Sequence, residues 1–141
     1  MRIFLDANIL VAVLCNEYPL FTHCARILSL ADNPKFEVFT SPLCLAIGFY
    51  FAEKKSGTQL AKRKISLLSE KLGISLMNEE VVLKAVRNKS IEDFEDGLQY
   101  YSAVNSKCKC IITEDKNDFY FSEIEILSAE EFLLEYAVRK K

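Results

Sequence analysis

The sequence predicts a single α/β domain with a parallel sheet of about five strands and helices on both faces. The chain has 141 residues, half of them hydrophobic, which is enough for one ordinary domain and too few for two. Short apolar runs of strand type alternate with longer helical segments, and no repeat, linker or low-complexity tract interrupts them. Strands separated by segments long enough for crossovers pair in parallel. We therefore predict one domain over residues 1–141.

The strands are predicted from short apolar runs or from alternation at period two, bounded by turn residues. These segments are 2–5, 36–40, 74–77, 109–113 and 123–127. Between them, helices are predicted over 8–14, 21–31, 42–55, 58–72, 79–87, 90–107 and from 128 onward. Ser90 with Asp93, and Ser128 with Glu131, have the spacing of capping boxes and predict the starts of the last two helices.

Composition excludes several classes of protein. The net charge is −2, which argues against a simple basic surface for nucleic acid. Residues 91–131 hold more than half of the 20 acids, and residues 53–89 hold half of the 18 bases, which predicts either an acidic metal site or two oppositely charged solvated faces. No apolar run reaches the roughly 18 residues that span a bilayer, so we expect no membrane segment. The odd number of cysteines suits free thiols, and we expect a cytoplasmic protein.

Polar side chains stand where strands of the predicted sheet end. Asp6 follows the first strand, and Thr113, Asp115 and Asp118 follow the fourth. Asp93 and Asp96 lie in the first turns of the helix that precedes the fourth strand, so they could converge with the others. In parallel sheets, ligands bind outside the carboxyl ends of the strands. Converging carboxylates repel each other unless a cation neutralises them, and oxygen ligands suit Mg²⁺ or Mn²⁺. Such ions activate water for phosphodiester hydrolysis.

Several of these residues have a structural alternative that the sequence leaves open. Asp93 is placed to be a capping-box residue, Asp118 to be a turn residue, and Asp6 to cap the helix that follows it. Thr113 could simply end its strand. The functional case depends on the acids occurring together.

Other chemistries fit the sequence less well. His23 is the only histidine, so a Ser-His-Asp or Cys-His site would depend on it alone, and we expect a structural or surface role. Cys108 and Cys110 lack a second pair of ligands, so zinc is not expected. A phosphorelay receiver domain needs adjacent acids after the first strand, and a haloacid-type phosphatase needs an Asp where the chain has Asn8.

Four segments in order resemble the PIN domain family. They are residues 3–10 (IFLDANIL), 40–42 (TSP), 93–100 (DFEDGLQY) and 111–119 (IITEDKNDF). The resemblance covers the whole chain and implies a Rossmann-like sheet and a Mg²⁺- or Mn²⁺-dependent ribonuclease. It also implies RNA as substrate, a possible cognate antitoxin of VapC type, and a homodimer. The helix over residues 43–50 is apolar on more than one face, which also favours self-association.

The resemblance carries site residues over by position. Asp6, Asp96 and Asp115 match the family's acidic residues and are the predicted catalytic and metal-binding set. Asp118 matches the frequent Asp of the D-F ending and is predicted as a further metal ligand. Two small polar residues, Asn8 and Thr113, match those beside the family's site, where we also place Asp93.

One position departs from the family pattern. The third helix usually carries a Glu in a stretch like S-x-x-x-L-A-E, whereas residues 41–47 here are SPLCLAI, so Ile47 stands at the expected Glu. Glu53 lies about 120° around the helix from Ile47 and about 9 Å along it, so it is no simple substitute. Two functions remain open: a metal-dependent endoribonuclease in which Asp93 or Asp118 supplies the missing carboxylate, and a catalytically weak or inactive PIN domain that binds RNA or protein.

Overall fold

Five parallel strands form one sheet in the order β3-β2-β1-β4-β5 in a computed structural model that describes residues 1–137. The strands are β1 Arg2–Leu5, β2 Glu37–Thr40, β3 Gly73–Ile74, β4 Cys110–Ile112 and β5 Glu125–Leu127. The predicted α/β fold with a five-stranded parallel sheet is confirmed. The last four residues of the predicted domain, 138–141, lie outside the described residues.

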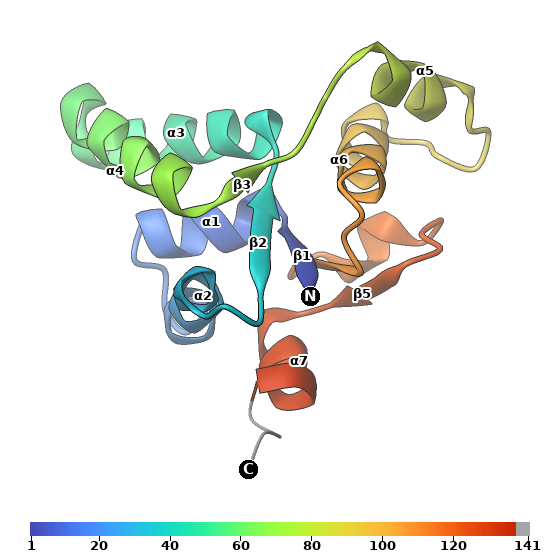
Figure 1. Ribbon diagram of the computed structural model, residues 1–141. Helices are drawn as coiled ribbons and strands as arrows, with labels where there is room; N and C mark the ends of the chain where they lie inside the picture. Colours follow the sequence, from blue (N-terminus) through green and yellow to red (C-terminus); the bar gives the residue numbers. More distant parts are fainter. Residues whose placement is uncertain (138–141) are drawn as a thin grey trace.

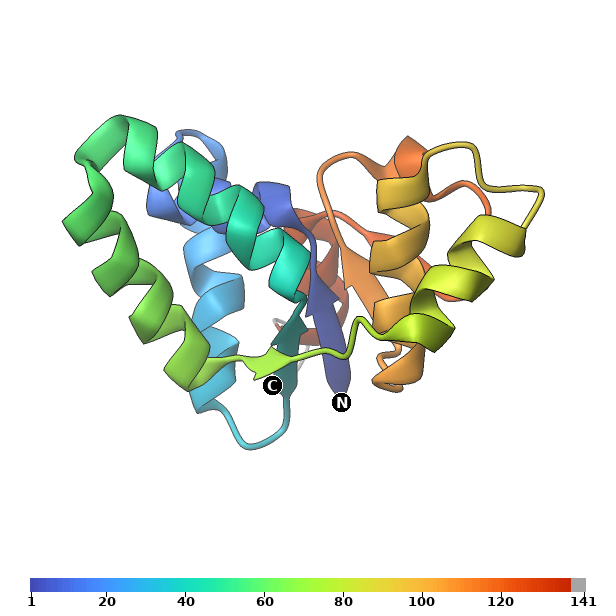
Figure 2. The same ribbon diagram turned by 90° about the horizontal axis from the view of Figure 1, so that it is seen from above.

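Helices connect every successive pair of strands. They are α1 Ala7–Leu14, α2 Leu20–Ser29, α3 Pro42–Ser56, α4 Thr58–Lys71, α5 Glu79–Arg87, α6 Phe94–Asn105 and α7 Ala129–Phe132, with 3-10 segments η1 Leu30–Asp32 and η2 Lys116–Phe119 and the π-helical segment η3 Leu133–Ala137. Figures 1 and 2 show α3 and α4 extending together on one side of the molecule, and α5 and α6 on the other. No helix among residues 1–137 is both long enough and apolar enough to cross a membrane.

The centre of the sheet is apolar and fully buried. Ile3, Phe4 and Leu5 of β1 have no exposed surface, and neither do Ile111 and Ile112 of β4. Such continuous apolar strands are expected where helices cover a parallel sheet. Leu5 pairs with Ile112, so the residues that follow these two strands emerge side by side at the carboxyl edge.

Side chains cap the starts of α3 and α7. The Ser41 side chain accepts from the Cys44 amide at the start of α3, and Ser128 with Glu131 forms the predicted capping box of α7. Gly57 ends α3 with φ 87°, a left-handed conformation that glycine adopts without strain.

The predicted capping box of Ser90 with Asp93 is wrong. Asp93 is itself the N-cap, and α6 begins at Phe94 because the Asp93 carboxylate accepts from the Asp96 amide, which leaves residues 88–93 as a loop. In that loop the Asn88 side chain accepts from the Ser90 amide, and the Ser90 carbonyl accepts from the Tyr120 hydroxyl. The structure therefore satisfies the backbone of Ser90 without a helix.

Candidate active site

The carboxyl ends of the strands border a cavity of about 370 Å³. Its lining residues come from α1, α3, α6, η2 and the loops after β1, α1 and β4: Asp6, Ala7, Asn8, Val11, Glu17, Ile47, Phe51, Glu95, Asp96, Gln99, Asp115 and Asp118. Six of these side chains are carboxylic acids and none is basic. The structure thus brings together the four predicted metal-binding acids, Asp6, Asp96, Asp115 and Asp118, although they are far apart in the sequence.

Asp6 joins β1 to α1, and its carboxylate accepts hydrogen bonds from Ala7, Asn8, Cys44 and Thr113. Its Oδ1 accepts from the Ala7 amide at 2.8 Å, and its Oδ2 accepts from the Thr113 hydroxyl at 2.9 Å. Burial raises the pKa of the Asp6 carboxyl; these two hydrogen bonds act in the opposite direction, and Asp115 and Asp118 raise the pKa further. Asp6 is therefore the N-cap of α1 and also part of the cavity wall, so the two alternatives for this residue are not exclusive.

Thr113 is the centre of the hydrogen-bond network beside Asp6. Its fully buried hydroxyl donates to Asp6 and accepts from the Asn8 side-chain amide and the Asp115 backbone amide, each at 3.0 Å. The Asn8 amide also donates to Asp115 Oδ2 at 3.1 Å, while the Asn8 oxygen accepts from the Glu114 amide at 3.1 Å. The network fixes two carboxylates, Asp6 and Asp115, relative to each other.

The third acid of the cavity is on α6. The Asp93 carboxylate accepts from the Asp96 amide at 3.1 Å and does not line the cavity, whereas Asp96 does. Burial, followed by the carboxylates of Asp93, Asp118 and Asp6, raises the pKa of Asp96 to about 7. Asp93 is thus a capping residue whose charge also acts on Asp96. Burial, then Asp115 and Asp93, raises the pKa of Asp118 as well.

Helix α3 supplies the opposite wall. Its N-cap, Ser41, donates to the buried side chain of Gln99 at 2.6 Å, which joins the start of α3 to α6. Ile47 lines the cavity, so the position of the family's Glu faces the acids and carries an apolar side chain. Glu53 does not line the cavity and accepts instead from the Thr58 hydroxyl at 2.7 Å. No acid of α3 replaces the missing one.

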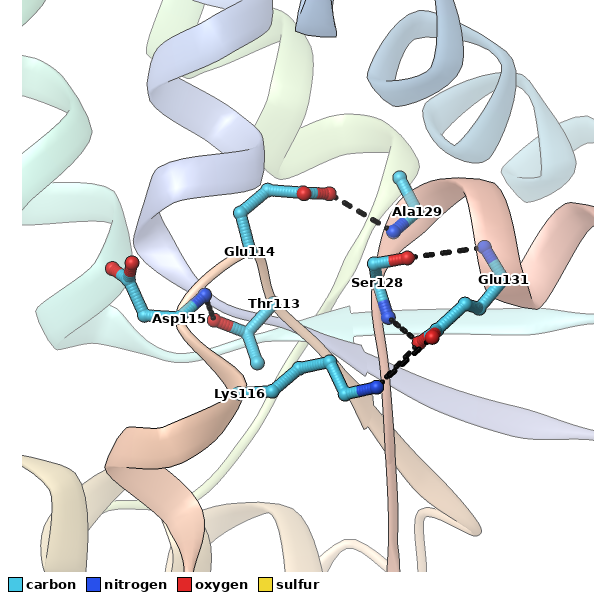
Figure 3. Close-up of polar contacts among 7 residues, drawn as sticks. All are labelled: Thr113, Glu114, Asp115, Lys116, Ser128, Ala129 and Glu131. Carbon is cyan, nitrogen blue, oxygen red and sulfur yellow. Dashed lines mark hydrogen bonds and ion pairs between the residues drawn. The ribbon is translucent and has the colours of Figure 1, made fainter.

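The loop that carries Asp115 is anchored to α7 on both sides (Figure 3). Glu114 accepts from the Ala129 amide at 3.0 Å, and Lys116 Nζ forms an ion pair with Glu131 at 2.8 Å. In Figure 3 the Asp115 carboxylate points away from these contacts. The neighbours of Asp115 therefore restrain its backbone while leaving its side chain to the cavity.

The donor set fits a hard divalent cation, because it consists of carboxylate oxygens, and burial together with neighbouring carboxylates raises the pKa of Asp6, Asp96 and Asp118. Among residues 1–137, however, no three His, Cys, Asp or Glu side chains lie close enough together to hold a metal ion as they stand. The acids share one cavity, and their role as ligands stays a prediction. Side-chain rotation would have to bring them onto a cation.

Sequence reasoning missed six lining residues: Ala7, Val11, Glu17, Phe51, Glu95 and Gln99. Gln99 follows Asp96 by three residues and Phe51 follows Ile47 by four, so helical spacing could have placed both on the cavity face. Glu95 adjoins Asp96 in the quoted motif. Glu17 lies in the loop after α1, and no sequence signal places it there.

The residues set aside from the sequence lie elsewhere. His23 is half-buried in α2 and does not line the cavity. Cys108 and Cys110 are buried and unbridged, and burial raises the pKa of each thiol to about 12.

The chain is similar to known proteins in both sequence and fold. Residues 2–117 match the PIN domain family. The chain is 28% identical over 138 residues to Ribonuclease VapC1 from Aquifex aeolicus (strain VF5), with 93% of this chain and 92% of that protein covered.

Two solved structures share the fold. The crystal structure of VapBC2 from Rickettsia felis bound to a DNA fragment from its promoter has a TM-score of 0.69 at 16% identity, over 91% of this chain and 98% of that chain. VapC20 from Mycobacterium tuberculosis, described as a sarcin-ricin loop cleaving toxin, has a TM-score of 0.68 at 17% identity, over 87% of this chain and 97% of that chain. Because the family match spans most of its length, this chain belongs to the PIN domain family.

Proposed function

We propose that this protein is an endoribonuclease that uses Mg²⁺ or Mn²⁺ in the acidic cavity. The observation that carries the proposal is the convergence of Asp6, Asp96, Asp115 and Asp118 on one cavity at the carboxyl ends of the strands. The similarity to Ribonuclease VapC1 supports RNA as the substrate. The cation would neutralise the carboxylates, activate water and stabilise charge on the phosphate in the transition state.

The residues of the chain divide the task between binding and placement. Asp6, Asp96, Asp115 and Asp118 would hold the cation. Thr113 and Asn8 keep Asp6 and Asp115 in register through the hydrogen bonds described above. Because these two residues already use their polar atoms within the protein, we assign them to positioning and not to contact with RNA.

A toxin–antitoxin pair is the proposed biological setting. The structural neighbour from Rickettsia felis is a VapBC complex, and an antitoxin partner is the corresponding proposal for this chain. A second cavity, of about 560 Å³, supports it: apolar residues of α1, α2 and α4 line it, including Phe21, Leu28 and Leu67, with Lys64 and Lys71 among the charged ones. An amphipathic helix of a partner could fill such a groove. Homodimerisation is proposed on the family resemblance and on the apolar character of residues 43–50.

The alternative function is a catalytically weak or inactive PIN domain that binds RNA or protein. Ile47 favours it, because this side chain occupies the cavity wall where the family carries a ligand. The two functions make opposite predictions for metal-dependent cleavage.

Calorimetric titration with Mn²⁺ and cleavage of a mixed-sequence RNA test the proposal together. Asp6→Asn is the diagnostic variant, because Asn keeps the size of the side chain and its capping ability while removing the charge. We expect Mn²⁺ binding and cleavage in the wild type, and a loss of at least tenfold in both for the variant. Glu70→Gln, an exposed acid outside the cavity, is the matched control and should behave as wild type.

Two outcomes would contradict the enzyme. The wild type could bind no Mn²⁺ at millimolar concentration, which would favour the non-catalytic module. Cleavage could also persist unchanged in Asp6→Asn, which would assign it to a different site or to a contaminant.

A further inference from the structure

Phe51 is out of keeping with the rest of the acidic cavity. The residue is 44% exposed and lies in the wall of a cavity that also contains six carboxylic acids. Val11 and Ile47 line the same cavity, so one wall is apolar and faces the acids. Ile47 and Phe51 are four residues apart on α3, which places them on one face of the helix about 6 Å apart along its axis.

The chemistry of the two walls differs in what each can bind. The carboxylates attract a cation and, through it, a phosphate. The apolar wall offers no hydrogen bond or charge to either, but it can pack against a flat uncharged ring. RNA carries such a ring next to every phosphate, namely its nucleobase.

We propose that the Phe51 ring is the stacking surface for an unpaired nucleobase of the RNA, beside the phosphate held over the acids. This inference deepens the proposed function and depends on it, since it names the conformation of the substrate. A base inside an A-form duplex has both faces covered by its neighbours, whereas a base in a loop or single strand can be turned out and stacked on an aromatic side chain. The substrate is therefore single-stranded or looped RNA.

The surroundings of Phe51 support a fixed ring. The Tyr50 ring lies edge-on to it, with centroids 5.1 Å apart and planes at 80°. The ammonium group of Lys54 lies 4.9 Å from the centroid of Tyr50, which brings a cation within one helical turn of Phe51. Lys54 and Lys55 lie in the last turn of α3, and Lys62 and Arg63 lie on α4, so this helix pair carries basic side chains that attract an RNA backbone.

The test compares three variants by steady-state cleavage of a mixed-sequence single-stranded RNA in Mn²⁺. Phe51→Leu keeps an apolar side chain but removes the aromatic face, and Phe51→Trp keeps and enlarges that face. Phe94→Leu is the matched control, because Phe94 is 48% exposed at the start of α6 but does not line the cavity. We expect KM to rise about tenfold in Phe51→Leu, within the range of one base–aromatic stack, with kcat nearly unchanged. Phe51→Trp and Phe94→Leu should keep the wild-type KM.

A second substrate tests the conformation. The same sequence annealed into a duplex should be cleaved poorly by the wild type, and Phe51→Leu should not make that cleavage worse. Equal KM values for wild type and Phe51→Leu, or a Trp variant as weak as the Leu variant, would overturn the stacking role.

Direct binding separates this inference from the enzyme itself. If the wild type cleaves nothing, the enzyme proposal fails, and fluorescence anisotropy with the labelled single-stranded RNA decides the role of Phe51. Tighter binding by wild type than by Phe51→Leu would sustain the stacking surface on a non-catalytic module. No binding, or equal binding, would overturn it.

Sedimentation of the same proteins examines the competing occupant, a second copy of the chain. A wild-type dimer that Phe51→Leu converts to a monomer would assign the ring to a protein interface instead of RNA.

Discussion

The two walls of the acidic cavity are built in opposite ways. The wall formed by β1 and β4 is polar, and Thr113 and Asn8 connect its carboxylates by hydrogen bonds of 2.9–3.1 Å. The wall formed by α3 is apolar, and Ile47 and Phe51 contribute no polar atom to it. A hydrogen-bond network tolerates few substitutions, because each lost partner leaves a buried polar group unsatisfied. An apolar wall accepts many side chains, so it is the part of the site where a PIN domain can change its function without losing its fold.

Thr113→Val should disrupt the hydrogen-bond network of the polar wall and destabilise the protein more than the other substitutions. Valine matches threonine in shape but removes the hydroxyl that donates to Asp6 and accepts from Asn8 and Asp115. With Thr113 fully buried, we expect the free energy of unfolding to fall by about 3 kcal/mol. Urea denaturation measures it. Thr113→Ser keeps the hydroxyl and is the control, so an equal loss in both variants would trace the effect to packing and not to the network.

Ile47→Glu gives the apolar wall the carboxylate of the family pattern. Its effect on stability should lie between those of the other two substitutions. The new carboxylate faces the acids of the cavity, and repulsion is of order 1 kcal/mol per close partner before screening. Without metal, we expect a lower melting temperature than in wild type. With Mn²⁺ the difference should shrink or reverse, because the cation binds the folded state, and cleavage should rise if the wild type is weak.

Ile47→Gln is the control for this variant, since glutamine has nearly the same shape as glutamate but no charge. The comparison is decided by the shift in melting temperature that Mn²⁺ produces. A shift no larger in Ile47→Glu than in Ile47→Gln would mean that residue 47 is not a ligand position, whatever the family pattern implies.

The sequence predicted the polar wall better than the apolar one. Asp6, Thr113 and Asp115 follow strands directly, and strand ends are visible in a hydrophobic pattern, so their convergence followed from the parallel sheet. Phe51 belongs to a helix that is apolar on several faces, so hydrophobic periodicity alone does not indicate which side of α3 meets the cavity. That side follows only from the family position of Ile47, four residues earlier. The start of α6 was placed too early, because Ser90 and Asp93 have capping-box spacing but Asp93 is the stronger acceptor for the first turn.

Asp96→Asn should change stability the least of the three substitutions. It tests whether the α6 side of the cavity binds the cation. Burial and then the neighbouring carboxylates raise the pKa of Asp96 to about 7. The folded protein therefore binds a proton that the unfolded chain, with a pKa near 3.9, has already released. Between these two pKa values the unfolded state binds fewer protons, so stability falls as the pH rises from about 4 to about 7. Above this window the full penalty of a charged Asp96 is present.

Asparagine cannot ionise, so Asp96→Asn should raise the melting temperature at pH 7.5 by a few degrees and change it little at pH 4.5. Because Asp96 is partly exposed, solvent screening keeps the gain small. Mn²⁺ should reverse the ranking at pH 7.5, since the cation stabilises the charged carboxylate of the wild type and the variant has lost it. Thermal melts of both proteins at the two pH values, each with and without Mn²⁺, measure these differences. If Asp96→Asn gains as much from Mn²⁺ as the wild type does, Asp96 does not bind the cation, and the α6 side of the cavity contributes only its charge.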